Sequence, residues 1–251
     1  MEKRSICLNC DMGESFGAWK MGNDESVMPH IHMANIACGF HASDPQVMNE
    51  TIKLAIKHDV QIGAHPSYPD LQGFGRRSMV MSPDEITNML IYQIGAIKGL
   101  ADSHNKDLSY VKPHGALYND MLKDLSIFES VIDAVSSFGL PLMTLAVADT
   151  QPYLYIADRY DVPLLFEAFA DRSYLANGFL APRGQDKAVL TNHEDILNQV
   201  LQISRYGKVR TIDGFSIALE ADTICVHGDN QEGVAMIKQI RSLLDKESQS
   251  T

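Results

Sequence analysis

Acidic side chains, imidazoles and a lysine recur in this chain directly after short apolar segments. These residues are Asp11, His41, His65, Lys112 with His114, Glu167, and His227 with Asp229. In a parallel α/β barrel, residues that follow the strands share one face, and barrel enzymes build their active sites there. One polar residue at such a place is more often structural than functional. Six such segment ends in one chain indicate a shared site.

Three of these segment ends offer a ligand set for a divalent metal ion. A carboxylate from Asp11 and imidazoles from His41 and His65 suit zinc or another transition ion and leave positions for water or substrate. The chain has no H-E-x-x-H sequence, so this hypothesis depends on the segment ends meeting in space. In the alternative, His41 and His65 transfer protons or donate hydrogen bonds without a metal.

The segment that contains Asp11 reads as a strand that stops at an acid, a glycine and a second acid. Strand alternation places Cys7, Asn9 and Asp11 on one side and Cys10 on the other. An ordinary turn, in which Asp11 and Glu14 bond their own backbone, would explain this segment taken alone. The other segment ends favour a functional interpretation.

Two further clusters of charged residues lie at or near these segment ends. Lys112 and His114 place a cation beside an imidazole, where Lys112 could stabilise an oxyanion or hold a carboxylate, although an exposed surface lysine is the simpler alternative. Glu167, Asp171 and Arg172 form a dense charged group, which a surface salt-bridge array of little energetic weight would also explain.

A glycine-rich stretch with two arginines, GFGRR at 73–77, could bind a phosphate or carboxylate through backbone N–H groups and the guanidinium of Arg76. The chain contains neither a G-x-x-x-x-G-K-[ST] sequence nor a G-x-G-x-x-G between a strand and a helix. Neither a Walker-type nor a Rossmann nucleotide site is therefore indicated.

The composition is that of a globular protein with a large core. The chain has 251 residues, 45% of them hydrophobic and 21% charged, and no linker or low-complexity tract divides it. We therefore expect one α/β-barrel domain over 1–251. The net charge of −11 and the scattered 21 Lys and Arg argue against nucleic acid as a partner. Apolar runs are too short for a membrane span, which predicts a cytoplasmic protein with reduced cysteines.

Strands and helices alternate about seven times along the chain, which favours a parallel barrel over an open doubly wound sheet. Periodicity does not decide whether the sheet closes. We expect a first strand that ends near residue 11. Further strands are expected at 32–38, 60–64, 110–112, 142–146, 164–166 and 223–226. A hairpin is expected at 208–217, and a binding loop or lid at 174–187. Helices are expected at 23–30, 44–58, from 82 onward, at 124–138, 151–160 and 192–206, and at the end of the chain.

The longest motifs together resemble a known family. They are LNCDMGESFGAWKMG, ANIACGFHASDP, GAHPSYPDLQGFGRR, VKPHGALYN, EAFADRSY, LAPRGQ and ADTICVHGD, and they run from Leu8 to Asp229. With these motifs the chain resembles the LamB/YcsF family of subunits of bacterial ATP-dependent 5-oxoprolinase. The resemblance implies a seven-stranded parallel (β/α) barrel, distorted and TIM-like, similar to the glycoside hydrolase/deacetylase superfamily.

The resemblance also implies a reaction and its partners. The lactam of 5-oxo-L-proline would be cleaved to L-glutamate with ATP and with companion B and C subunits, and ATP could bind on this chain or on a partner. Phosphorylation of the carbonyl oxygen would activate this stable amide, after which stabilising the oxyanion becomes the main need. The oligomeric state stays open, a homo-oligomer included.

Residue roles follow from the resemblance as hypotheses. Asp11, His41 and His65 would bind a metal or activate water, while Lys112 and His114 would bind the oxyanion or the substrate carboxylate. The expected catalytic group is completed by Glu14, Glu167 and Asp229, of which Glu167 or Asp229 would transfer a proton. The expected substrate-binding group is Asn9, Asn35, Arg76, Asp171, Arg172 and His227.

Two other functions remain open from the sequence. The Asp/His/His set and the superfamily similarity would also suit a metal-dependent N-deacetylase acting on a sugar or another small amide. A non-catalytic subunit that only binds the substrate is the third interpretation.

Overall fold

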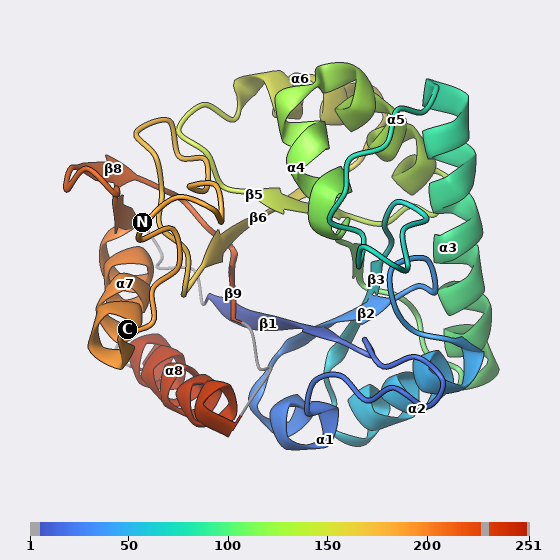
Figure 1. Ribbon diagram of the computed structural model, residues 1–251, viewed down its shortest axis with the longest axis horizontal. Coiled ribbons are helices and arrows are strands. Elements are labelled where there is room, and N and C mark those ends of the chain that lie inside the picture. Colours follow the sequence, from blue (N-terminus) through green and yellow to red (C-terminus); the bar gives the residue numbers. More distant parts are fainter. Residues whose placement is uncertain (1–5, 227–230, 250–251) are drawn as a thin grey trace.

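Seven parallel strands form a closed barrel in the computed structural model of the chain, which describes residues 6–226 and 231–249 (Figure 1). The order around the barrel is β1-β2-β3-β4-β5-β6-β9. The strands are β1 Cys7–Met12, β2 Met33–Ala37, β3 Gln61–His65, β4 Tyr110–Val111, β5 Leu142–Leu145, β6 Leu164–Phe169 and β9 Thr223–Cys225. The predicted seven-stranded parallel barrel is confirmed, and β1 closes it by pairing with both β2 and β9.

Helices surround this barrel (Figure 1). They are α1 Asp24–Val27, α2 Pro45–Lys57, α3 Pro83–Ser103, α4 Gly115–Lys123, α5 Leu125–Ser136, α6 Gln151–Arg159, α7 His193–Tyr206 and α8 Gln231–Gln249, with a 3-10 turn at Met28–His30. The helix expected at 23–30 is thus α1 followed by the 3-10 turn. Side-chain caps begin α2 and α3 as expected, because Asp44 accepts two backbone N–H bonds and Ser82 forms a capping box with Glu85.

Two elements differ from the sequence-based expectation. Helix α4 was not predicted, because no side chain among the described residues caps its start. Its first turn is held instead by a bond from the Ala116 N–H to the Gly75 carbonyl oxygen, at 2.8 Å. Strand β6 continues through Phe169 rather than ending at Phe166, so Glu167 lies inside the strand.

The rest of the chain matches the expected organisation. The hairpin consists of β7 Lys208–Arg210 and β8 Ser216–Ala218, which pair antiparallel. All four cysteines are free thiols, and burial raises the pKa of Cys38 to about 12. Within the described residues, none of the helices combines the length and the apolar character needed to cross a bilayer.

Candidate active site

The carboxyl ends of the strands bring most of the expected catalytic residues together. Asp11 is the second-last residue of β1, His65 is the last residue of β3, and Lys112 follows β4 directly. His114 is the residue before α4, and Glu167 points from within β6 to the same place, where it meets Lys112. The expected His227 and Asp229 lie outside the described residues.

A buried lysine lies between two carboxylates at this end of the barrel. The Lys112 ammonium is 3.1 Å from Asp11 Oδ1 and 2.8 Å from Glu167 Oε1, and its side chain is 3% exposed. Burial opposes the positive charge, but the carboxylates of Asp11 and Glu167 outweigh it and hold the pKa of Lys112 well above its ordinary value. Lys112 is therefore a fixed cation rather than an exposed surface lysine.

Glu167 is completely buried, and both of its oxygens are engaged. Oε1 faces Lys112, and Oε2 accepts a hydrogen bond from the Tyr118 hydroxyl at 2.9 Å. Burial raises the pKa of Tyr118 well above its usual value, so this hydroxyl keeps its proton and donates. Glu167 therefore neutralises the charge of Lys112 and fixes the position of its ammonium group from within β6.

Asn9 and Asn35 support Asp11 from inside the barrel. The Asn35 amide donates to Asn9 Oδ1 and to Asp11 Oδ1, each at 2.8 Å. Asn9 in turn donates to Thr223 at 2.9 Å, and the Tyr110 hydroxyl donates to Asn35 Oδ1 at 2.6 Å. Because both asparagines are fully buried, they fix the orientation of the Asp11 carboxylate from beneath.

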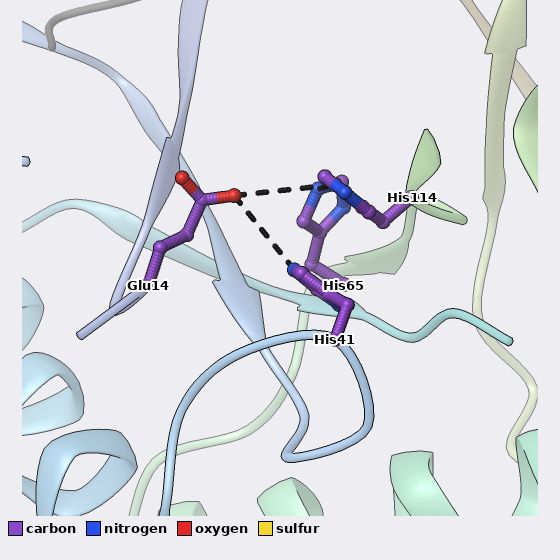
Figure 2. Close-up of side chains that lie close together, drawn as sticks. All are labelled: Glu14, His41, His65 and His114. Carbon is purple, nitrogen blue, oxygen red and sulfur yellow. Dashed lines mark hydrogen bonds and ion pairs between the residues drawn. The ribbon is translucent and has the colours of Figure 1, made fainter. Parts of the chain in front are cut away.

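Three imidazoles stand beside these charges, with Glu14 facing them (Figure 2). The rings of His41 and His114 stack, with centroids 3.8 Å apart and planes 3° apart. The ring of His65 is edge-on to that of His114, at 4.8 Å and 85°. Glu14 Oε1 lies 3.7 Å from His41 Nε2 and 3.9 Å from His114 Nδ1.

Hydrogen bonds to the backbone fix which nitrogen of His65 and His114 carries the proton. His65 Nδ1 lies 2.7 Å from the Lys112 carbonyl oxygen, and His114 Nε2 lies 2.9 Å from the Phe74 carbonyl oxygen. Carbonyl oxygens only accept, so these two nitrogens are the N–H donors. In the neutral form of each ring, the lone pair is then on His65 Nε2 and on His114 Nδ1, and these two atoms are 2.9 Å apart.

The tautomer of His41 follows from its neighbour Ser67. The Ser67 hydroxyl donates its hydrogen to the Tyr68 carbonyl at 2.8 Å, so it accepts from His41 Nδ1 at 3.0 Å. His41 Nε2 therefore carries the lone pair. Burial lowers the pKa of His41 well below its ordinary value and that of His114 to about 3, which keeps both rings neutral near pH 7.

Glu14, His41, His65 and His114 form a candidate metal site. One ligand atom from each lies within 4.8 Å of those of the other three. The set expected from the sequence shares His41 and His65 with this group but has Asp11 as its carboxylate. Asp11 Oδ2 is 3.4 Å from His65 Nε2, while Oδ1 accepts from both Lys112 and Asn35.

Asp11 and Glu14 are the groups of this site that face outward. The side chains of Asp11 and Glu14 are 14% and 15% exposed, whereas those of Lys112 and the three imidazoles are almost fully buried. A small hollow beside the two carboxylates is lined by them and by Asp24, among other residues. An incoming molecule therefore meets Asp11 and Glu14 first.

The predicted substrate-binding arginines lie in different surroundings. Arg76 is exposed, and its guanidinium lies 5.1 Å above the ring of Phe74, next to the imidazoles. Arg172 is buried and donates to the carbonyl oxygens of Ala181 at 2.7 Å and Ala188 at 3.4 Å. Arg172 thus fixes the loop that follows β6, and the half-buried Asp171 precedes it in that loop.

Sequence reasoning missed three residues that complete the site: Tyr118, Ser67 and Phe74. Tyr118 lies one helical turn after His114 on α4, so recognising that helix would have placed it near the site. Ser67 follows His65 by two residues, and the Phe74 carbonyl lies in the glycine-rich stretch. A backbone carbonyl leaves no signal in the sequence.

Gly75 permits the close packing of the imidazoles. It has φ +62°, and a Cβ atom there would lie 2.9 Å from both His114 Cδ2 and His41 Cβ. Its carbonyl oxygen also receives the Ala116 N–H at the start of α4. The glycine therefore couples the 73–77 stretch to the imidazoles and to α4.

Gly75→Ala should destabilise the protein more than Gly139→Ala does. Gly139 has the same φ of +62°, and a Cβ there would meet no described atom within 4 Å. Both variants carry the strain of a left-handed residue, but only the first adds overpacking, which we expect to cost about 1–3 kcal/mol more. Denaturant melts of both variants measure the difference, and equal losses would show that the imidazoles adapt to the extra methyl group.

Comparisons with known proteins agree on one family. Residues 6–251 match the model of the LamB/YcsF family. The chain is 68% identical to the A subunit of 5-oxoprolinase from Vibrio cholerae serotype O1, over 98% of this chain and 100% of the relative. It is 52% identical to a 5-oxoprolinase A subunit from Pseudomonas aeruginosa, over 96% of this chain and 97% of the relative.

A solved structure is similar along the same length. The crystal structure of the lactam utilization protein from Thermus thermophilus superposes with a TM-score of 0.89 at 38% identity. The match covers 96% of each chain. Fold and sequence similarity therefore extend together over nearly all of this chain.

Proposed function

The chain belongs to the LamB/YcsF family, and we propose that it is the A subunit of an ATP-dependent 5-oxoprolinase. In this role it opens the lactam of 5-oxo-L-proline to give L-glutamate. The names of the relatives support the reaction. The reaction is placed at this site because of the Asp11 carboxylate, which lies 3.1 Å from the Lys112 ammonium and beside His65 at the barrel mouth.

Asp11 supplies the proton transfers in this proposal. Ring opening adds a water oxygen to the lactam carbon, breaks the C–N bond and leaves a proton on the nitrogen. The ammonium of Lys112, 3.1 Å from Oδ1, holds the Asp11 carboxylate in position to take the proton from water. The Asp11 carboxyl group then returns this proton to the leaving nitrogen.

Arg76 is our candidate for binding the carboxylate of 5-oxo-L-proline. Its guanidinium is exposed and lies over Phe74, whose carbonyl oxygen holds His114. A guanidinium binds a carboxylate through two parallel N–H bonds, so it fixes orientation as well as charge. Bound in this way, the lactam ring would face the carboxylates and imidazoles.

ATP and the companion subunits belong to the same proposal. Transfer of the γ-phosphoryl group of ATP to the lactam oxygen, with ADP as the leaving group, would turn a stable amide into a better electrophile. After water has added and the C–N bond has broken, a second water would release the phosphoryl group as inorganic phosphate. We assign the nucleotide site to the B or C subunit, because this chain carries neither of the two common phosphate-binding sequences.

Glutamate release from 5-oxo-L-proline tests the proposed function. We expect this chain alone to form no glutamate, and the chain with the B and C subunits and ATP to form it. Omitting ATP, or omitting this chain from the mixture, should each abolish glutamate formation. Full turnover by B and C alone would contradict the proposal. Release of acetate from an N-acetylated sugar by the isolated chain would favour the deacetylase alternative.

A further inference from the structure

We propose that Glu14, His41, His65 and His114 bind one divalent transition-metal ion of the zinc type. The inference depends on the contacts of these four residues and not on which amide the protein cleaves. Three imidazole nitrogens and a carboxylate oxygen are ligands that zinc and similar ions accept. The three observations that follow point to a cation at the point where these residues meet.

The first observation is a pair of facing acceptors. His65 Nε2 and His114 Nδ1 are 2.9 Å apart, and each ring has its N–H committed to a backbone carbonyl on the other side. Two lone pairs at this distance repel each other unless a positive centre lies next to both. A metal ion or a shared proton would supply it.

The second observation separates these two possibilities. His41 Nε2 is buried and has no hydrogen-bond partner among residues 6–226 and 231–249. Its lone pair points toward Glu14 Oε1, which is 3.7 Å away and is itself an acceptor (Figure 2). A proton shared by His65 and His114 would leave this nitrogen unsatisfied. A metal ion can accept electron pairs from all three rings and from Glu14 once the stacked rings of His41 and His114, whose planes are 3° apart, turn so that both lone pairs point at the ion.

The third observation is the support behind each ring. The nitrogens that face away from the cluster donate to the Lys112 carbonyl, the Phe74 carbonyl and the Ser67 hydroxyl. Imidazoles that ligate metals usually donate their second N–H in this way, which fixes the tautomer and the ring plane. The rings are therefore set in the metal-binding tautomer before any ion arrives.

Glu14, rather than Asp11, is the carboxylate ligand in this inference. Glu14 follows β1, and Gly13 with φ +68° turns the chain before it. The Oδ1 atom of Asp11 is already shared by Lys112 and Asn35. Asp11 Oδ2 lies 3.4 Å from His65 Nε2, but the group of ligand atoms that all lie within 4.8 Å of one another contains Glu14 and not Asp11, so we place Asp11 beside the metal rather than on it. An ion there would act as a Lewis acid toward a bound oxygen.

Binding of Zn²⁺ and Co²⁺ to the isolated full chain tests this inference. After removal of metals with a chelator, we expect the chain to bind one Zn²⁺ in competition with a chromophoric chelator. Co²⁺ should give visible ligand-field absorption. Glu14→Gln and His41→Ala should each weaken Zn²⁺ binding at least about tenfold, by analogy with the losses seen when the surroundings of a metal site are changed.

A matched variant makes the result specific. His193→Ala removes an exposed imidazole at the start of α7 and should leave Zn²⁺ affinity unchanged. Thermal melts without metal check that every variant is folded.

Two outcomes would overturn the inference. Either the wild-type chain binds no stoichiometric Zn²⁺, or Glu14→Gln and His41→Ala bind it as tightly as His193→Ala. Because no substrate or companion protein is present in these measurements, their result is independent of whether the complex opens a lactam.

Discussion

Lys112→Met should lower the free energy of unfolding by about 3–5 kcal/mol, the loss typical when one partner of a buried ion pair is removed. The methionine fills much of the same space, but it leaves the carboxylates of Asp11 and Glu167 without their shared cation. Glutamate formation by the reconstituted complex should fall to background, because Asp11 loses the cation that holds its carboxylate in place.

A control and a second variant make this prediction specific. Lys98→Met breaks an exposed pair with Asp102 on α3 and should cost less than about 1 kcal/mol. Adding Glu167→Gln to Lys112→Met removes one orphaned charge and should restore part of the lost stability. Denaturant melts of the variants measure these differences. A Lys112→Met protein as stable as Lys98→Met would show that the buried ion pairs contribute little to the fold.

Asp11→Asn should reduce the rate of glutamate formation by the complex by about 10²–10⁴-fold, the range associated with loss of a general base. The fold should persist, because the amide oxygen of asparagine can still accept from Lys112 and Asn35, and Glu167 still neutralises the lysine. The measurement is kcat in the reconstituted complex, with a thermal melt of the variant chain alongside.

The same variant separates a catalytic chain from one that only binds. If Asp11→Asn binds 5-oxo-L-proline normally and the complex keeps its wild-type kcat, this chain delivers substrate to a site elsewhere. If binding persists and kcat falls, the carboxylate acts in the reaction. A variant that loses both would place Asp11 among the groups that hold the substrate.

The sequence was informative where a local rule determines the outcome. Alternation along β1 placed Asn9 and Asp11 on the same side of the strand, where both accept from the Asn35 amide, and Asp44 and Ser82 marked two helix starts. Helix α4 was not predicted from the sequence, because a hydrogen bond from the Ala116 N–H to the Gly75 carbonyl oxygen takes the place of a side-chain cap. That bond joins residues far apart in sequence, so no local pattern reports it.

Charged residues were harder to assign. Glu167 was expected to follow the strand at 164–166. A carboxylate inside a barrel is costly without partners. Lys112 and Tyr118 remove that cost and allow β6 to continue. Arg172 was expected to bind substrate, but the structure shows its guanidinium engaged with two carbonyl oxygens of its own loop. Residue type alone does not separate these two uses of an arginine.

The grouping of Glu14 with the imidazoles was also beyond sequence reasoning. His41 and His65 were placed in a metal hypothesis, but Asp11 was chosen as the carboxylate because it ends the strand. The turn at Gly13, which precedes Glu14, and the bonds to Asp11 Oδ1 are features of the folded chain, and they underlie our proposal of Glu14 in place of Asp11.

A crystal structure of the Asp11→Asn chain with 5-oxo-L-proline would show directly whether the lactam is opened at the mouth of this barrel. We expect the lactam at the mouth, with a polar atom within hydrogen-bond reach, about 2.6–3.2 Å, of residue 11 or Glu14. The substrate carboxylate should lie against Arg76. A ligand bound elsewhere on the chain, with only water at the mouth, would show that the lactam is not opened there.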